Sequence, residues 1–515
     1  MTDVGDPMEI ELTLRLDPVV AKRLLRDPLL CKFRQGRRTT QRLLSTYFDT
    51  PDFRLRRQRA ALCVRQIGAR CIQTVKLVAN AERSILARHE WERELDGTAP
   101  DLRDIDDRHV RRIVKGNIGD RLAPIFVTEI TRSVTPLEVD GSVIELAVDI
   151  GEIHTSHGRV PVCEAELELK SGQVASVYKL AQELNRRVPL SIEPLSRAER
   201  GYALAANVHP PPRKADPVRL DPAMTAGQAF QSIARNCLLH LRTNEASVRA
   251  EPTVEGVHQL RVAIRRFRSA LSVFGPMLPA GERRRIGQRL RWIARQCARA
   301  RELDVILEDT LYPMRAHLPG NAGLAAFVSV VEDARTAARN AVVTTLNSRE
   351  YTDTLLMIEA WIEGRDWLTA SDGIAGQSVR GFARTVLKRL HRKLRKAGRD
   401  LENLDEAGLH ALRIRAKKLR YAGEFFRGVF RAKVARSYLA SLVEIQDCLG
   451  ALNDGAVAHR LVADLERGGR SEPAPARFAR AAGAVLGWSA CQTAAGLERL
   501  PDAWDAFRAA RPLWK

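Results

Sequence analysis

Two segments of the chain place a histidine and several cations on one face of a predicted helix. In the first segment, residues 257–274, basic and apolar side chains each recur at helical spacing, on different faces. Such a helix packs its apolar stripe against a core and presents its basic stripe to anions or to solvent. Anion binding is therefore one interpretation, and a solvated basic face is the other. The residues concerned are His258, Arg261, Arg265, Arg266 and Arg268.

The second segment, residues 410–426, repeats the first. When His410 is set on His258, the other basic positions also align, and Phe426 falls on Phe274. An internal repeat of this kind predicts two related helical halves, each with a basic face. Neither segment has the HxxxH spacing of a metal pair, so the histidines either hydrogen-bond phosphate or pack between helices. The aligned residues are His410, Arg413, Lys417, Lys418 and Arg420.

This pair of motifs resembles the signature of the CHAD family, helical domains with a conserved histidine that bind inorganic polyphosphate. The resemblance rests on HxLRVxxRRxRSxxxxF, on HxLRIxxKKLRYxxEFF, and on the later segments 301–305 and 449–454. It covers the chain from about residue 226 to the C-terminus, and Glu302 stands where the family more often has aspartate. The resemblance implies a helical bundle whose two basic faces bind polyphosphate.

Three predicted strands carry alternating carboxylates. Residues 8–16, 142–150 and 162–170 alternate polar with apolar side chains, which predicts strands with one polar face. Polar faces of antiparallel sheets often meet water. If a barrel turns them inward instead, crowded carboxylates repel unless they bind a cation or stay protonated, and magnesium or manganese with a phosphate chain suits both signs. The acidic set is Glu9, Glu11, Glu145, Asp149, Glu164, Glu166 and Glu168, and the nearby basic set is Arg65, Lys76, Arg132 and Arg197.

The same stretch resembles the CYTH domain, the triphosphate tunnel metalloenzymes, from Met8 to about Ala206. The likeness rests on the order EIEL, YFDTP, LCVRQ, RHEWE, CEAELELKSG and LSRAERGYAL. It implies an antiparallel tunnel of eight strands, in which Mg²⁺ or Mn²⁺ on glutamates activates water against a bound triphosphate. By position, the resemblance implies catalytic roles for Glu9, Glu11, Glu166 and Glu168. It implies metal binding by the same four residues together with Glu164 and Asp149, and a supporting role for Glu145. The phosphate-binding residues that it implies are Arg65, Lys76, Arg132, Arg197 and Arg15.

One position departs from the CYTH pattern. The family opens with ExExK, and here Thr13 replaces the lysine. Arg15 lies on the same strand face, about 7 Å further along, and is a candidate to restore the lost charge. A charge-assisted phosphate contact contributes roughly 1.5–3 kcal/mol, so its loss would cost about 10–100-fold. We therefore expect phosphate binding to survive better than turnover, and a catalytically weak or inactive domain is the alternative to an active enzyme.

The elements that carry these residues predict an α+β protein of two domains. An eight-stranded antiparallel β barrel is expected over residues 1–207, a Pro-rich linker over 208–224, and an all-α pseudo-twofold bundle over 225–515. Within the bundle, the two repeats are expected at about 226–362 and 377–515. Gly450 and Asn453 are expected to interrupt a helix as a turn.

Composition narrows the classes of partner. The chain has 515 residues and a formal net charge of +21, which favours a polyanion, while only 5% aromatic residues argue against base stacking and nucleic acid. Eight scattered cysteines without CxxC, no signal peptide and no apolar span predict a cytoplasmic protein that does not enter membranes. The leading hypothesis is a metal-dependent triphosphatase joined to a polyphosphate-binding module. A polyphosphate-granule-binding protein without activity and a nucleic-acid-binding protein are the alternatives, and oligomeric state is not determined.

Overall fold

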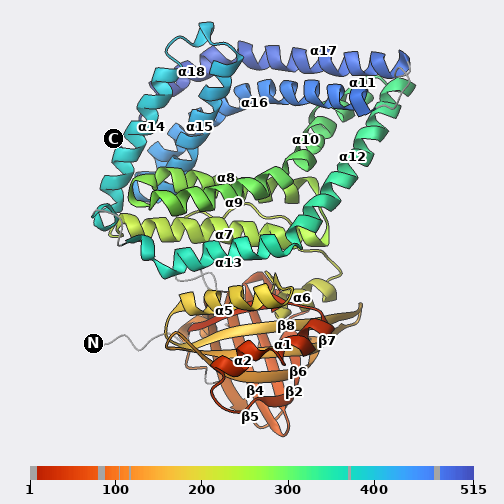
Figure 1. Cartoon of the computed structure of the whole chain (residues 1–515), viewed down its shortest axis with the longest axis vertical. Coiled ribbons are helices and arrows are strands. Elements are labelled where there is room, and N and C mark those ends of the chain that lie inside the picture. The colour runs from red at the N-terminus through yellow and green to blue at the C-terminus, as the bar shows by residue number, and fades with distance from the viewer. Residues whose placement is uncertain (1–7, 79–86, 104, 115–117, 369–372, 469–475) are drawn as a thin grey trace. The chain divides into compact units, whose positions relative to one another are not determined.

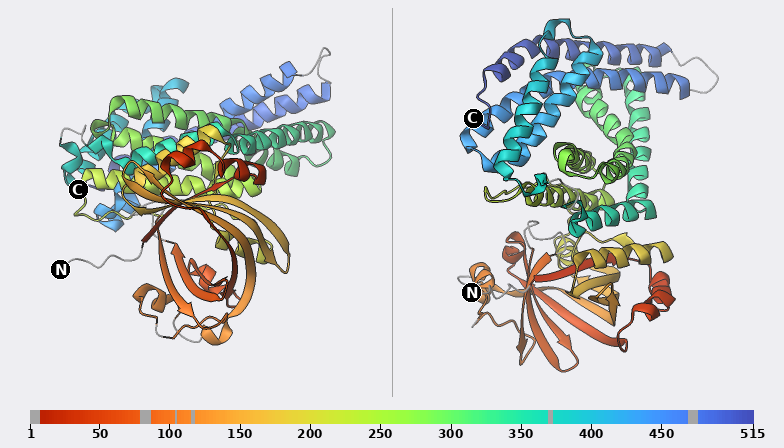
Figure 2. Two further views of the ribbon diagram at one scale, coloured as in Figure 1. Left: turned by 60° about the horizontal axis from the view of Figure 1, so that its bottom comes forward. Right: turned by 60° about the vertical axis from the view of Figure 1, so that its left-hand side comes forward.

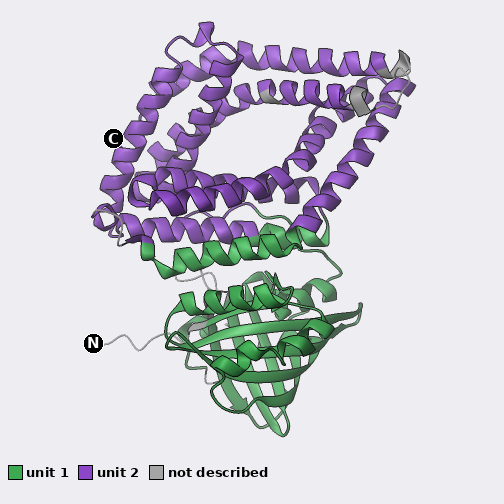
Figure 3. Cartoon of the chain, viewed as in Figure 1, with its two compact units in different colours: residues 1–213, 242–251, 346–366 green, residues 214–241, 252–345, 367–515 purple. Residues whose placement is uncertain are grey.

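The chain divides into two compact units, each described here by itself. The computed structural model describes residues 8–78, 87–103, 105–114, 118–368, 373–468 and 476–515. One unit comprises residues 1–213, 242–251 and 346–366, and the other comprises the rest (Figure 3). Within the described ranges, no helix combines the length and the hydropathy that crossing a membrane requires.

The first unit contains a closed antiparallel barrel. Its strands are hydrogen-bonded in the order β5-β4-β3-β2-β6-β7-β8-β1, and β1 pairs again with β5, so β1 to β8 form a ring (Figure 2). A two-residue strand, β9 (Ser191–Ile192), pairs with the C-terminal end of β1. The predicted eight-stranded barrel is thus confirmed. Its strands are β1 (Met8–Arg15), β2 (Thr39–Asp49), β3 (Ala60–Ile67), β4 (Arg70–Val78), β5 (Ala87–Leu95), β6 (Ala123–Val139), β7 (Ser142–Thr155) and β8 (Gly158–Ser171).

Alternation along the strands separates the two faces of the barrel wall. On β8, Ala165 and Leu167 are fully buried, and helix α5 (Val174–Arg187) packs on this strand (Figure 1). The polar residues between them face the opposite way, into the lumen, because successive side chains of a strand point to opposite faces. The apolar wall therefore holds the carboxylates of the lumen in place.

Further helices complete this unit. Helix α13 packs on α5, where Asn185 Nδ2 donates to Asp353 Oδ1 at 2.6 Å. The Tyr351 hydroxyl donates to Glu245 Oε2 at 3.0 Å. The helices are α1 (Pro18–Leu24), α2 (Pro28–Phe33), α3 (Arg54–Arg57), α4 (Arg108–Ile113), α6 (Arg197–Ala205) and α13 (Arg349–Gly364).

The second unit is helical. Its two repeats meet at an aromatic cluster, in which the aligned residues Phe274 and Phe426 touch, with ring centroids 5.6 Å apart. Phe382 stacks on Phe274 at 5.0 Å. Its helices are most of α7 (Ala226–Ala250), then α8 (Val254–Val273), α9 (Ala280–Gln296), α10 (Ala298–Ile306), α11 (Tyr312–His317), α12 (Ala322–Leu346), α14 (Val379–Ala397), α15 (Glu406–Phe426), α16 (Ala432–Gly468), α17 (Ala476–Glu498) and α18 (Leu500–Ala509).

One local prediction for this unit was wrong. Helix α16 runs without a turn through Gly450 and Asn453. Glycine in a helix costs only about 1 kcal/mol relative to alanine, and α16 packs along α15 and α17 with Leu442, Ile445 and Leu449 buried. The burial of this apolar face outweighs the local preference.

Candidate functional site

Carboxylates from three neighbouring strands lie side by side in the barrel. Glu168 on β8 is paired in register with Glu11 on β1 and with Glu145 on β7. Directly opposed side chains of an antiparallel pair have Cβ atoms about 5 Å apart, where like charges repel. The row of Glu11, Glu168 and Glu145 therefore favours a neutralising cation, and Lys170 already pairs with Glu168 at 2.6 Å.

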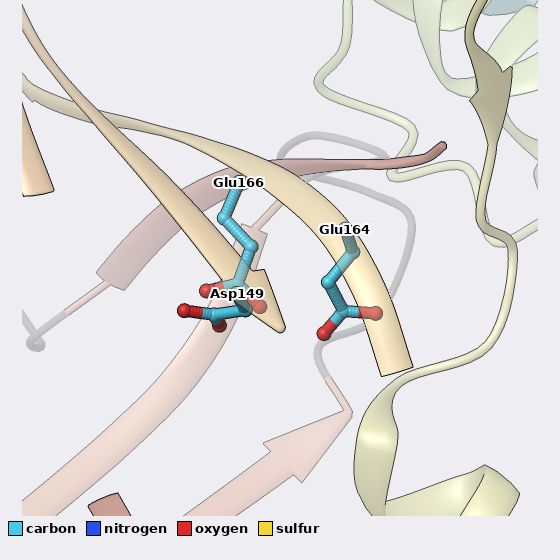
Figure 4. Close-up of side chains that lie close together, drawn as sticks. All are labelled: Asp149, Glu164 and Glu166. Carbon is cyan, nitrogen blue, oxygen red and sulfur yellow. The ribbon is translucent and has the colours of Figure 1, made fainter. Parts of the chain in front are cut away.

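A second acidic group lies further along the same face. Carboxylate oxygens of Asp149, Glu164 and Glu166 all lie within 4.8 Å of one another, and their side chains gather between β7 and β8 (Figure 4). Arg132 on β6 forms a bidentate pair with Asp149, from Nε to Oδ1 at 2.8 Å and from Nη2 to Oδ2 at 2.6 Å. Arg132 also pairs with Glu166. This group is thus already partly neutralised by arginine.

Helix α6 brings two more arginines to the acidic group. Arg197 pairs with Asp149 at 2.8 Å and with Glu166, and Arg200 pairs with Glu164. The helix begins with a capping box, in which the Ser196 and Glu199 side chains satisfy each other's backbone N–H groups.

Gly201 lets α6 approach the barrel. A Cβ added at Gly201 would meet the ring of Phe126 at 2.2 Å, so only glycine fits at this separation. The helix therefore lies close enough to β6 for its arginines to reach the lumen.

The electrostatics of the acidic group differ from one carboxylate to the next. Burial alone would raise the pKa of Glu166, but Arg197 and Arg132 hold that pKa well below its usual range. Burial raises the pKa of Glu164 to about 7, against the opposing charges of Arg197 and Arg200. Arg197 Nε lies 3.0 Å from Glu164 Oε1 without the angle of a hydrogen bond, so this buried oxygen has no donor.

The opposite part of the lumen carries the basic residues. Lys76 Nζ on β4 lies 3.1 Å from Glu90 Oε1 on β5. Arg65 and Lys76, together with Arg197, act electrostatically on Tyr47 of β2, although burial and Cys63 still raise the pKa of Tyr47 to about 12. The predicted cations Arg65, Lys76 and Arg197 therefore all lie near Tyr47.

In the C-terminal half of β1, Thr13 and Arg15 both contact residues of the protein itself. The Thr13 hydroxyl donates to Glu11 Oε1 at 2.9 Å, and both residues are buried. Arg15 is exposed, and its guanidinium donates to Asn347 Oδ1 at 3.3 Å. Glu9 belongs to β1, but its side chain lies outside the part of the chain that the structure describes.

In the helical unit, the two motif helices α8 and α15 pack together and combine their cations. Arg265 on α8 lies close enough to Arg413 and Lys417 on α15 to act on both electrostatically. Burial, then Arg413 and Arg265, lower the pKa of Lys417 to about 7. We call His258, Arg261, Arg265, Arg413 and Lys417 the central cluster.

Two arginines of the central cluster differ in how their guanidinium groups are satisfied. Arg413 Nε is buried and has no hydrogen-bond acceptor, whereas Arg261 donates to the backbone oxygen of Ala294 at 2.8 Å. Burial, followed by Arg301 and Arg265, lowers the pKa of His258 to about 4. His258 is therefore neutral near pH 7 and can act only as a hydrogen-bonding group.

Comparison with known proteins identifies both units. The CYTH domain model matches residues 7–202, and the CHAD domain model matches residues 232–463.

The chain joins a CYTH domain to a CHAD domain.

Three known proteins are similar to parts of the chain. An inorganic triphosphatase from Haemophilus influenzae is 29% identical over 199 residues, which is 38% of this chain and 55% of that protein. The chain thus spans about half the length of the curated relative. The crystal structure of the CHAD domain from the plant Ricinus communis is 30% identical, with a TM-score of 0.51, and covers 59% of this chain and 98% of its own. A putative adenylyl cyclase from Hippeastrum, described as having a dominant triphosphatase activity, is 22% identical with a TM-score of 0.30, covering 39% of this chain and 96% of its own.

The remaining predicted residues of the CHAD domain lie outside the central cluster. Arg266 is buried, donates to Asn236 Oδ1 at 2.8 Å and lies over the ring of Phe425, so it belongs to the core. Arg420 donates to Gln446 and Glu424. The others also lie apart: Arg268 has Arg291 near it, Lys418 is close to Arg283, Arg389 and Lys393, and His410 is exposed.

Several residues at the two sites were not predicted. In the CYTH lumen they are Glu90, Glu92, whose carboxylate accepts from the Thr74 hydroxyl at 2.7 Å, and Arg200. Alternation about Trp91 would have revealed the two glutamates, and the spacing of three from Arg197 on a helix would have revealed Arg200. In the CHAD domain, Arg301 beside His258 was missed as a site residue.

The carboxylates of the CYTH lumen fit a divalent cation at one of the two acidic groups. Mg²⁺ and Mn²⁺ take carboxylate oxygens as ligands. At Asp149, Glu164 and Glu166 an ion would have to displace arginines. In the row of Glu11, Glu168 and Glu145, Lys170 Nζ lies 2.6 Å from Glu168 Oε1. Lys170 is exposed at the end of β8, so an ion would displace one surface lysine there instead of the arginines of the other group.

Proposed function

We propose that the protein hydrolyses tripolyphosphate or short polyphosphate in its CYTH lumen with Mg²⁺ or Mn²⁺, and that its CHAD domain binds polyphosphate. The observation that carries the proposal is a lumen with a row of carboxylates, Glu11, Glu168 and Glu145, together with the cations Arg65 and Lys76. A phosphate chain and a divalent cation need both kinds of group at once. The inorganic triphosphatase relative supports the same reaction.

Each part of the lumen has a role in this proposal. Arg65, Lys76, Arg132 and Arg197 bind phosphate oxygens, and substrate oxygens replace the carboxylates that now pair with the two buried arginines. Glu11, Glu168 and Glu145 would hold the divalent ion, with Glu9 as a further candidate. When bound, the ion supplies charge neutralisation at the phosphoryl oxygens and a lowered pKa for water.

The test is phosphate release from tripolyphosphate in Mg²⁺ or Mn²⁺, with and without a chelator. The variant Glu11→Gln/Glu168→Gln removes two carboxylates of the row, and Glu129→Gln, an exposed partner of Arg42, is the matched control. We expect release by the wild type and the control, and a loss of at least about 100-fold in the double variant. Equal rates in all three proteins, or release unaffected by the chelator, would contradict the proposal.

A CYTH domain without turnover is the second candidate. It is favoured by Thr13 in place of the family lysine, since the Thr13 hydroxyl is used by Glu11 and adds no positive charge. The protein would then act through its CHAD domain, as a component of polyphosphate granules. Thr13→Lys separates the two: a large gain in kcat with little change in KM favours the inactive domain, and no gain favours the enzyme.

Nucleic acid remains the third candidate, with the net charge of +21 as its only support. Competition at physiological salt decides it. We expect long-chain polyphosphate to displace duplex DNA readily, and the reverse order would favour a nucleic-acid-binding protein.

A further inference from the structure

A second group of cations lies on the CHAD domain outside the central cluster. Three helices contribute to it: α9 supplies Arg283, α14 supplies Arg389 and Lys393, and α15 supplies Lys418. Burial and the charges of the other three lower the pKa of Lys418, and no carboxylate is among the groups that act on it. We call these four residues the outer cluster.

The packing of the three helices explains why the cations meet. Phe382 of α14 stacks on Phe274, which caps the end of α8 in the connection to α9, and Phe274 touches Phe426 at the end of α15. The same region holds the Arg283 guanidinium close to Gly275, where an added Cβ would lie 3.2 Å from it. The absence of a side chain at Gly275 therefore leaves room for the Arg283 guanidinium.

The structure shows few partners for these cations among the residues that it describes. Among the described residues, no ion pair or hydrogen bond engages Arg389, Lys393 or Lys418, and Arg283 Nε is buried without an acceptor. A ligand could supply the missing acceptor, as it could at Arg265 Nε and Arg413 Nε of the central cluster, which are also buried without one. Four converging positive charges also repel one another, so an anion between them would stabilise the domain.

The repeat shows that the fold does not require this arrangement. Lys418 aligns with Arg266 in the first half, and Arg266 is buried against Phe425 and donates to Asn236. The first half thus uses the aligned position for packing. The second half leaves Lys418 half-exposed among other cations.

The outer cluster continues into a row of exposed cations on α14. The helix has no acidic residue, and side chains four residues apart lie about 6 Å apart along one face. Each step of four residues also turns about 40° around the helix, so the row winds slowly over α14, and an unbranched, flexible polyanion can follow such a path. A stacking platform for single-stranded nucleic acid would need aromatic side chains, and α14 has only the buried Phe382. The exposed row is Arg380, Arg384, Lys388, Arg392 and Lys396.

We propose that the outer cluster is a second phosphate-binding site, which holds a more distant stretch of the polyphosphate chain whose other part lies at the central cluster. The inference rests on the proposed function of the CHAD domain. Lys417 and Lys418 point about 100° apart around α15, and Ile414, which lies between these directions, is 55% exposed. A flexible chain can therefore pass over α15 from one cluster to the other.

Two sites on one chain give a length dependence. A short phosphate chain occupies one cluster at a time, whereas a long chain engages both, and the second contact is favoured by a high effective concentration. Long-chain polyphosphate is thus expected to bind more tightly than tripolyphosphate. The difference in affinity should exceed the statistical factor that comes from its larger number of phosphates.

The test compares three double variants by equilibrium binding of tripolyphosphate, long-chain polyphosphate and duplex DNA. Arg389→Gln/Lys393→Gln removes the outer cluster, Arg265→Gln/Arg413→Gln removes the central one, and Arg431→Gln/Lys433→Gln is a control of equal charge at exposed positions. We expect the outer variant to bind long-chain polyphosphate about 10-fold more weakly than the control, with tripolyphosphate affinity unchanged. The slope of log affinity against log salt should also fall by about 1–2.

Other results would overturn the inference. If the outer variant matches the control while the central variant loses binding, the second site is absent and the proposed function stands. If the wild type binds no polyphosphate, both the inference and the polyphosphate-binding function fail. If the outer variant loses only duplex DNA, the surface is a nucleic-acid interface.

Discussion

Raising the pH above neutrality should weaken polyphosphate binding by the CHAD domain, because Lys417 must then take up a proton to bind. In the folded protein the pKa of Lys417 is lowered from 10.5 to about 7, by burial first and then by Arg413, Arg265 and Arg420, while Asp454 on α16 opposes the shift. A phosphate beside the ammonium group restores its charge. His258, with a pKa of about 4, does not titrate in this range.

The size of the effect follows from one proton. Above pH 7, affinity should fall by up to about 10-fold for each pH unit, which is about 1.4 kcal/mol, until the pKa of the bound state is reached. The titration of Lys417 itself does not destabilise the fold in this range. Between pH 7 and 10.5 the unfolded chain binds more protons at Lys417 than the folded chain, so this residue makes the free energy of unfolding rise with pH.

Calorimetric titration with long-chain polyphosphate at pH 7, 8 and 9, in two buffers of different ionisation enthalpy, measures both affinity and proton uptake. Lys417→Arg keeps its charge throughout and should bind with little pH dependence, and Lys433→Arg is the exposed control. An affinity that stays constant from pH 7 to 9 in the wild type would refute the reasoning. So would a Lys417→Arg protein that keeps the slope of the wild type.

Three further predictions concern packing and charge. Arg197→Met leaves buried carboxylates short of a partner and should lower the free energy of unfolding, measured by urea denaturation, by about 3–5 kcal/mol. Adding Mg²⁺ should recover part of this loss. No change in stability would show that the ion pairs of Arg197 with Asp149 and Glu166 contribute nothing. Gly201→Ala forces a Cβ against Phe126 and should cost about 1–3 kcal/mol, whereas Gly483→Ala, in open space, should not destabilise; equal stabilities would contradict the close approach of α6. Arg266→Leu should lower the free energy of unfolding by about 1–3 kcal/mol and leave polyphosphate affinity unchanged. A loss of affinity in the folded variant would show that Arg266 takes part in binding.

Sequence was sufficient where one physical rule dominates. Strict alternation along β1, β7 and β8 predicts which side chains share a face, because the period of a strand is two, and the register then places Glu11, Glu168 and Glu145 together. The helical repeat likewise predicts that α8 and α15 bring their cations together. In the structure the two helices pack on each other, and Arg265 lies close enough to Arg413 and Lys417 to act on both electrostatically.

Sequence was insufficient where tertiary neighbours decide. Arg266 and Lys418 occupy aligned positions of the repeat, yet one is buried and the other lies in a cationic group. The difference comes from Asn236 and Phe425, which lie far from Arg266 in the sequence. The continuous α16 shows the same effect, because its buried face outweighs a glycine that would favour a turn in isolation.

The contact between Phe274 and Phe426 has a consequence for the origin of the helical half. In a homodimer with a twofold axis, a residue on the axis touches its own copy in the partner subunit. Phe274 and Phe426 hold matching places in the two repeats and touch in this way within one polypeptide. The bundle thus has the geometry expected if a gene for a self-associating ancestor was duplicated and fused, after which each copy of a formerly identical residue became free to change by itself.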